Sequence, residues 1–186
     1  EYMTSLALHL NIQAENLYNS WLPSSGNYAD KFLKAGAGSN IFVKKQDAFI
    51  AITDGMIGIC GEVADGKMKE PFDAFDPTIV ESPFSGNSVA DFKNNIIGAY
   101  NVYQGKFIED GAAIQDLVKL RNSALNAELE QKFVAAINSF DAITIPYEQA
   151  IINQRTQCQN TMNAITALSN ILDAQLKPFV IANITD

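Results

Sequence analysis

The stretch from Glu81 to Gly105 reads ESPFSGNSVADFKNNIIGAYNVYQG and joins a loop to the clearest helix start in the chain. Its first six residues are rich in serine, proline and glycine, which predicts a turn-rich loop. Asn87 or Ser88 can then cap a helix, and Asp91 falls in its first turn, where the helix dipole favours negative charge. The stretch therefore predicts a helix that begins near residue 88.

This predicted helix has two distinct faces. Apolar residues recur at spacings of three and four on one face, which marks it for the core: Val89, Phe92, Ile96, Ala99 and Tyr103. The other face carries mostly amides and glycines: Asp91, Asn94 or Asn95, Gly98, Asn101 and Gly105. Because amides and glycine are weak helix formers, such a face indicates close packing or ligand binding. A solvated face with one close helix contact is the alternative.

A second long helix is predicted at residues 40–65. Its apolar stripe consists of Phe49, Ile52, Met56, Ile59 and Val63. Beside the stripe lies a groove of small residues that ends in a carboxylate: Ala51, Gly55, Gly58 and Glu62. We expect this groove to pack on the Gly98 face, which would bring Glu62 close to the amides of that face and form a polar pocket. The alternative is a kinked helix with a solvated Glu62.

One long ordered loop is expected at about residues 66–86. This segment lacks apolar periodicity and contains three prolines. Its three aromatic residues predict that the loop packs against the body: Phe72, Phe75 and Phe84. Lys67 and Lys69 are interpreted as surface charges.

The rest of the chain also has the pattern of amphipathic helices. The first, at residues 2–22, carries one apolar stripe: Met3, Leu6, Leu10, Ala14, Leu17 and Trp21. Shorter helices are expected at about 28–34 and 112–121. Two long helices follow, one capped by Asn122 or Ser123 and the other after a break at Pro146. Each has an apolar stripe: Leu125, Leu129, Phe133, Ile137, Phe140 and Ile143 in the first, and Cys158, Met162, Ile165, Leu168, Leu172, Leu176 and Phe179 in the second. We therefore expect an all-α bundle of four to five long amphipathic helices, forming a single domain over residues 1–186.

Composition limits the class of protein and its partners. With 47% hydrophobic and 18% charged residues the chain is globular, and its net charge of -8 argues against nucleic acid or an anionic membrane surface as a partner. No apolar run approaches the ~20 residues of a membrane-spanning helix. The chain begins at Glu1 without a signal-like segment, so we expect a processed or truncated form.

The residues that could carry thiol or zinc chemistry are few. Cys60 and Cys158 lie on apolar faces and are expected to be buried thiols, with a disulfide as the alternative. No Cys/His spacing indicates a zinc site. His9 is the only histidine and lies at the edge of an apolar stripe, so it is interpreted as packed or exposed and not as a ligand.

The organising stretch resembles the second half of the imelysin family, whose pattern is E-S-x-F-S-x-N-[ST]-x-x-D followed by N-x-x-G-x-x-N-x-Y-x-G. The resemblance continues through Ile114 to Val118, through Pro146-Tyr147, where the family tends to have Pro-Phe, and through the last helix. It implies an all-helical protein of the bacterial cell envelope that is linked to iron uptake or described as a metallopeptidase. The family's Gly-x-His-x-x-Glu motif is missing here, so the chain looks like the C-terminal half of such a protein or a relative without the motif.

The resemblance and the polar face together define the candidate site. The ligand-binding candidates are Glu62, Glu81, Ser85, Asn87, Asp91, Asn95, Asn101 and Tyr103. No catalytic residue is assigned. The cofactor that the resemblance implies is a metal ion, iron or zinc, shared with a missing N-terminal half. That half or an equivalent domain is the expected partner, together with other metal-uptake components.

Three functions remain open at this point. The first is a non-enzymatic binding component of iron or metal uptake, located in the periplasm or anchored to the outer membrane as a lipoprotein. The alternatives are a metallopeptidase whose metal motif lies in the missing half, and a structural interaction module. Because the chain has one histidine and few clustered carboxylates, we expect neither peptidase activity nor tight transition-metal binding from it alone.

Overall fold

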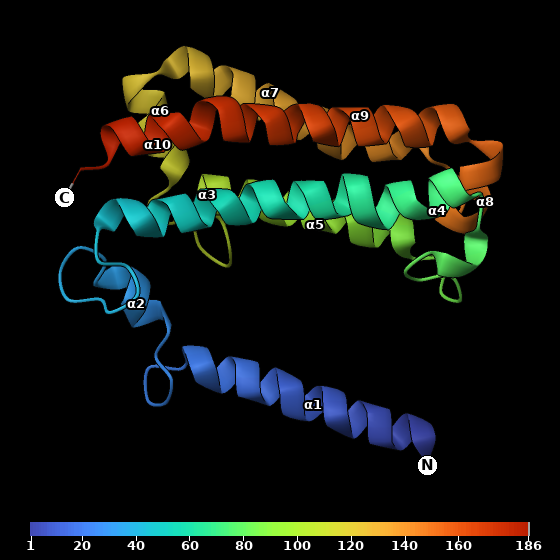
Figure 1. Ribbon diagram of the computed structural model, residues 1–186, viewed down its shortest axis with the longest axis horizontal. Coiled ribbons are helices and arrows are strands. Elements are labelled where there is room, and N and C mark those ends of the chain that lie inside the picture. Colours follow the sequence, from blue (N-terminus) through green and yellow to red (C-terminus); the bar gives the residue numbers. More distant parts are fainter. Residues whose placement is uncertain (186) are drawn as a thin grey trace. The chain divides into compact units, whose positions relative to one another are not determined.

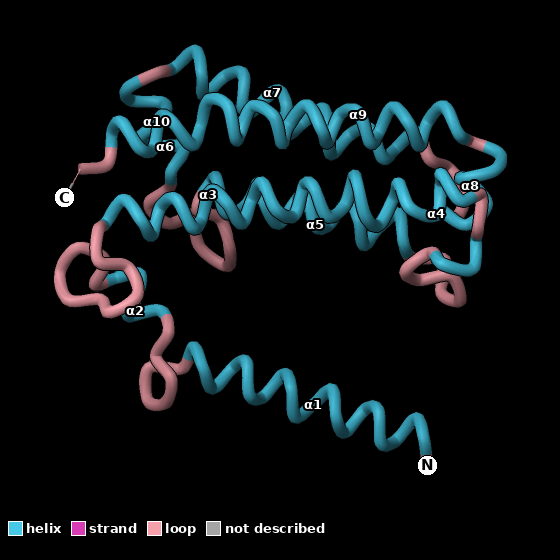
Figure 2. The backbone as a smooth tube through the Cα atoms, viewed as in Figure 1, coloured by secondary structure: helices cyan, strands magenta, loops and turns pink. Residues whose placement is uncertain are grey.

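A computed structural model describes residues 1–185 as helices joined by loops (Figures 1 and 2). No strand forms in this range, where Lys106 and Asp110 make one isolated bridge. The prediction of an all-α protein is therefore confirmed. The α-helices are α1 Tyr2–Trp21, α2 Ala29–Leu33, α3 Lys45–Gly61, α4 Lys69–Ala74, α5 Ser88–Gln104, α6 Ile114–Arg121, α7 Ser123–Ser139, α8 Tyr147–Asn153, α9 Arg155–Ile171 and α10 Lys177–Asn183.

The chain divides into two compact units. One comprises Ile52–Phe179, and the other comprises Glu1–Ala51 together with the end of the chain from Val180. In the larger unit α7 packs along α9, while α5 and α6 pack on α7 (Figure 1). Its core consists of fully buried side chains from these helices: Phe92, Ile96, Tyr103, Leu129, Phe133, Ile165 and Leu168. The apolar stripes predicted for α5, α7 and α9 are thus the core faces.

Local sequence signals explain where these helices begin. Asn122 accepts a hydrogen bond from the backbone N–H of Leu125 (3.0 Å), which confirms one of the two predicted caps of α7. α5 begins at Ser88, as predicted. Pro146 stands at the N-cap of α8, where its missing N–H breaks no helical hydrogen bond.

The loop expected at residues 66–86 is wrong in its first part. Helix α3 begins at Lys45, later than predicted, and continues through a π-helix, Glu62–Met68, into α4. Val63, Ala64 and Met68 are the buried residues of this π-helix, whose wider turn departs from the 3.6-residue period on which the prediction relied. Pro71, which cannot donate a backbone hydrogen bond, follows this turn. The loop itself runs from Phe75 to Asn87 and contains one 3₁₀ turn, Pro77–Ile79.

The smaller unit has a core of its own. Ala35, Phe42 and Ala48 are buried with Phe32 packed against them, and the rings of Trp21, Tyr28, Phe32 and Phe42 form a continuous chain of aromatic contacts. The Gln46 side-chain amide donates to the carbonyl oxygens of Ile181 (2.7 Å) and Ile184 (3.1 Å), tying the start of α3 to the end of the chain. These contacts hold α2 and the following loop, while α1 has no buried residue.

Among residues 1–185 no helix combines the length and the apolar composition that crossing a membrane requires.

Candidate functional site

Side-chain hydrogen bonds fix the loop before α5. The Ser82 hydroxyl donates to one carboxylate oxygen of Asp91 (3.0 Å), and the Asn87 amide donates to the other (2.5 Å). The backbone N–H of Ser82 donates to the buried Ser88 hydroxyl oxygen (3.2 Å), and the Ser85 hydroxyl donates to the Ser82 carbonyl (3.3 Å). The polar residues of the quoted stretch therefore form one network that orders the loop.

This network differs in detail from the predicted cap. Asn87 stands at the N-cap position, but its side chain caps no backbone N–H in the described helix. Asp91, which lies in the first turn as predicted, accepts from two side chains. The difference arises because Asn87 at the N-cap has helical dihedral angles (φ -94°, ψ -3°) and not the extended geometry of a capping residue.

Glu62 and Glu81 come together although nineteen positions separate them in the sequence. The Lys67 ammonium lies 3.4 Å from the Glu62 carboxylate and 3.0 Å from that of Glu81. The three side chains line a hollow of about 360 Å³, with Gly66, Glu70, Pro71 and Ile79 completing its wall. The π-helix supplies both Glu62 and Lys67, and the ordered loop supplies Glu81.

Lys67 pairs with both of these carboxylates. Its hydrogen bond to Glu81 is the largest of the effects that raise its pKa, so it stays protonated at neutral pH. Because the ammonium lies between the two carboxylates, it occupies the place that a cation would need. Among residues 1–185 no group of three or more His, Cys, Asp or Glu side chains could hold a metal ion. The side chains present therefore do not fit the iron or zinc ion that the family resemblance implies.

The other predicted site residues are not gathered into this hollow. Asn95 and Asn101 are half-buried on α5. Tyr103 belongs to the core: its hydroxyl donates to Asn126 (3.0 Å), its ring stacks on Phe133, and burial raises its pKa. Of the eight candidates, the structure brings Glu62 to Glu81 and, separately, joins Ser85, Asn87 and Asp91 through the loop network.

The glycine groove does not pack on the Gly98 face, so this expectation is wrong. At Gly55, Gly58, Gly61 and Gly98 no described atom beyond the helix's own backbone lies within 4 Å of the position that a Cβ would take. The inward faces of these helices are instead their apolar stripes, which bury Met56 and Cys60 on one helix and Phe92 and Ile96 on the other. The glycines lie on the opposite faces.

Arg155 was not identified from the sequence, yet it anchors the end of α4. Its guanidinium lies over the rings of Phe72 (3.6 Å to the ring centroid) and Phe75 (3.8 Å), and it donates to the Phe72 carbonyl (3.0 Å). Of the three aromatics that were predicted to pack the loop against the body, Phe72 is buried, whereas Phe75 is largely exposed and Phe84 is fully exposed. The sequence could not reveal this contact between the guanidinium and the two rings, because about 80 positions separate Arg155 from them.

Both cysteines are free, buried thiols, as the composition favoured. Burial raises the pKa of Cys60 to about 12 and that of Cys158 to about 11. Thiols with such pKa values carry almost no thiolate at neutral pH and are poor nucleophiles and metal ligands.

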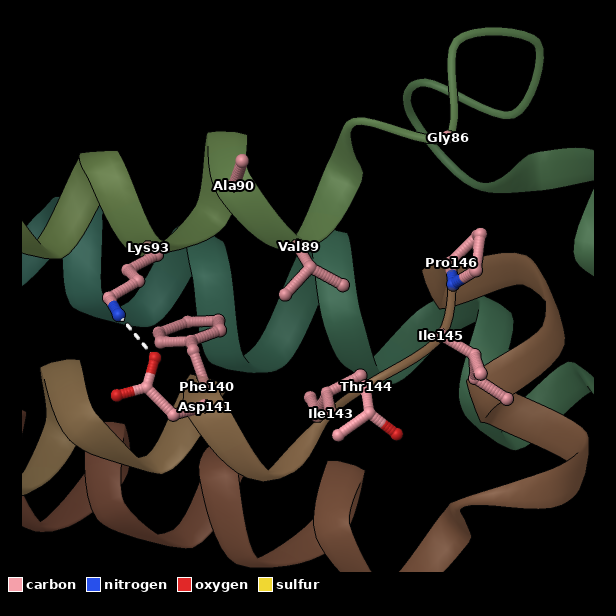
Figure 3. Close-up of a pocket in the computed structure, with 10 residues that line it drawn as sticks. All are labelled: Gly86, Val89, Ala90, Lys93, Phe140, Asp141, Ile143, Thr144, Ile145 and Pro146. Carbon is pink, nitrogen blue, oxygen red and sulfur yellow. Dashed lines mark hydrogen bonds and ion pairs between the residues drawn. The ribbon is translucent and has the colours of Figure 1, made fainter.

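A second hollow adjoins the loop network (Figure 3). This open cleft of about 500 Å³ lies between the start of α5 and residues 140–146, and Figure 3 shows Val89 and Phe140 projecting into it. The ion pair of Lys93 with Asp141 lies at one end. Next to Gly86, at the other end, one carboxylate oxygen of Glu148 is buried without a hydrogen-bond partner among the described residues.

Comparison with known proteins agrees with this architecture. The imelysin family profile matches residues 1–175. Iron-regulated protein A of Synechococcus elongatus is 29% identical over 97% of this chain and 52% of its own length. The crystal structure of an imelysin peptidase from Bacteroides ovatus superposes on the whole chain with a TM-score of 0.89 at 27% identity, over 56% of that protein.

A second solved structure is an iron-regulated protein A precursor from Parabacteroides distasonis. It has a TM-score of 0.77 and 26% identity, and the match covers 92% of this chain and 52% of that protein. The chain thus spans about half the length of the relatives that it matches. A profile match over almost the whole sequence, together with the shared helical fold, shows that this chain belongs to the imelysin family.

Proposed function

We propose that this chain is a non-enzymatic binding module of an iron-associated protein of the bacterial cell envelope. In this proposal its polar surface forms one wall of a site that a second domain completes. The observation that carries the proposal is the position of Glu81. It lies in the ordered loop and faces Glu62 across Lys67, so two charged residues that are nineteen positions apart in the sequence are held at one hollow.

Several features support the proposal that this polar surface binds another domain. Ser85 and Asn87 belong to the ordered loop, and Asn95 and Asn101 lie on α5, so the polar groups are presented from rigid elements. The relatives are about twice as long, which leaves room for such a domain in a protein of this type. The word precursor in the name of the Parabacteroides distasonis protein supports an exported location.

Metal binding by the chain alone is not part of the proposal, because Lys67 already pairs with both carboxylates. Isothermal titration calorimetry with Fe²⁺ and with Zn²⁺ tests this directly. We expect no binding tighter than about millimolar, since too few ligands are available to displace the water of the ion. One-to-one binding in the micromolar range that is lost in a Glu62→Gln, Glu81→Gln double variant would contradict it.

A metallopeptidase is the second candidate, and the structural likeness to an imelysin peptidase favours it. His9 lies on the exposed surface of α1, and no group of carboxylates or thiols capable of holding a metal joins it within residues 1–185. Incubation of the purified chain with an unfolded protein substrate should therefore give no cleavage. Cleavage that a chelator and His9→Ala both abolish would establish the enzyme in place of the binding module.

A further inference from the structure

Arg155, the first residue of α9, lies where the ends of α4 and α8 meet the start of its own helix (Figure 1). Its Nη1 atom donates to the carbonyl oxygen of Phe72 in α4 (3.0 Å) and to that of Ile151 in α8 (2.7 Å). The guanidinium also lies over the rings of Phe72 and Phe75. Because two hydrogen bonds and two rings hold this side chain, its other N–H groups are fixed in direction before any ligand binds.

These contacts leave most of the donors of Arg155 unused. A guanidinium has five N–H groups, and Nη1 carries two of them. The Nε–H and the two N–H groups of Nη2 have no acceptor among residues 1–185. Within the same range no carboxylate forms an ion pair with this half-buried arginine. Since a charge that is partly removed from water is normally paired, an anion is the partner that this arrangement lacks.

Arg155 lines an open hollow of about 410 Å³, a volume typical of small-molecule sites. The other side chains in its wall are Phe72, Thr156, Gln159 and Asn160. Three of these are neutral and can donate hydrogen bonds, and the fourth offers an apolar ring. The only formal charge in the wall is therefore the positive charge of Arg155, in a chain whose net charge is -8. All five residues belong to the larger unit, Ile52–Phe179.

We propose that this hollow binds the carboxylate of a small organic acid. Two N–H groups of a guanidinium match the two oxygens of a planar carboxylate, which is the geometry that arginine recognises best. The hydroxyl of Thr156 and the amide of Asn160 supply further hydrogen bonds, and the Phe72 ring supplies a contact for the apolar part of the acid. The hollow shares no residue with that of Glu62, Lys67 and Glu81, so the proposal does not depend on the function proposed above.

An NMR titration of the chain with benzoate tests the proposal. The sequence contains only two arginines, Arg121 and Arg155, so there are only two arginine Nε–H signals to follow. We expect benzoate to shift the Arg155 signal in a saturable, one-to-one manner with a Kd in the low millimolar range. Benzamide has nearly the same shape but no charge, and it should bind at least about tenfold more weakly. Both titrations use the wild-type chain and therefore do not depend on the folding of a variant.

Two variants then locate the binding. Arg155→Lys keeps the charge but removes the planar group, so it should weaken benzoate binding at least about fivefold. Arg121→Lys is the matched control, because Arg121 is exposed at the end of α6 in the same unit and lies outside the hollow. It should keep the Kd within about twofold of the wild-type value. Circular dichroism shows whether each variant is folded, and the wild-type titrations decide the question if Arg155→Lys is not.

Each result supports or overturns the proposal. Saturable binding of benzoate at Arg155 that is weaker for benzamide and is reduced in Arg155→Lys alone supports it. The absence of a saturable shift up to about 50 mM benzoate overturns it. Equal binding of benzamide also overturns it, because the charge would then play no part, and so does an equal loss in both variants. Tighter binding of inorganic phosphate than of benzoate overturns the carboxylate as the class of ligand.

Discussion

A substitution at Gly98 tests directly whether the face of α5 that carries this glycine is exposed or packed against another helix. The glycine is in the interior of the helix, and no described atom outside the helix's own backbone lies within 4 Å of the position of its missing Cβ. Gly98→Ala therefore adds a methyl group in open space. Glycine in an exposed helix interior is less favourable than alanine by about 0.8–1.0 kcal/mol, so the substitution should raise the free energy of unfolding by about that amount.

Gly105 in the same stretch is the matched control. It ends α5 with a φ of +64°, and a Cβ there would lie 2.8 Å from the Gly111 carbonyl oxygen and 3.0 Å from that of Ala112. A side chain in the left-handed conformation costs about 1–2 kcal/mol before the steric clash is added. Gly105→Ala should therefore lower the free energy of unfolding by about 2 kcal/mol or more.

Urea unfolding followed by circular dichroism measures both changes. The slope of the unfolding free energy against urea should stay the same, so that the midpoint alone reports stability. A midpoint that falls in Gly98→Ala would refute the reasoning, because it would show that another helix packs against this face. Such a result would restore the original expectation that the groove of Gly55 and Gly58 meets Gly98.

Three further predictions concern the loop network and the π-helix. Asp91→Ala removes the acceptor of two side-chain hydrogen bonds, so it should lower the free energy of unfolding by about 1 kcal/mol and speed proteolysis of the loop. An unchanged rate of proteolysis would contradict this prediction. Tyr147→Phe leaves the buried Met68 carbonyl without its donor (2.7 Å) and should cost about 1–3 kcal/mol in thermal or urea unfolding. The pKa of Lys67 is raised in the folded state, so its stabilising effect is fully present below the pKa of the unfolded chain and is lost as pH rises through the folded value. Stability measured against pH should therefore fall less steeply at alkaline pH in Lys67→Met than in the wild type.

Periodicity predicted the inward faces well. The stripes of α5, α7 and α9 needed only the spacing of apolar residues, because a side chain that recurs every three or four positions must share a face with its neighbours. Tyr103 illustrates the limit of reading chemistry from such a pattern. Its position on the apolar stripe placed it in the core, and the family pattern alone made it a site candidate.

Two kinds of feature were beyond the sequence pattern. The π-helix Glu62–Met68 departs from the 3.6-residue period of an α-helix, so a continuous helix looked like a loop. Contacts between distant positions could not be predicted from the sequence either. Lys67 was interpreted as a surface charge, although it bridges two carboxylates. The contact of Arg155 with the rings of Phe72 and Phe75 was missed. Spacing identifies which residues share a face, but only the tertiary fold decides what that face meets.

The exposed glycines bear on function as well as on stability. Gly55, Gly58 and Gly98 each weaken a helix by about 1 kcal/mol relative to alanine, and no packing within the described residues compensates for this. If a second domain packs on these faces, as in the proposed function, an added methyl group would obstruct its approach. Gly98→Ala would then stabilise the isolated chain while weakening its association with that domain. These opposite effects would separate a binding face from a merely solvated one.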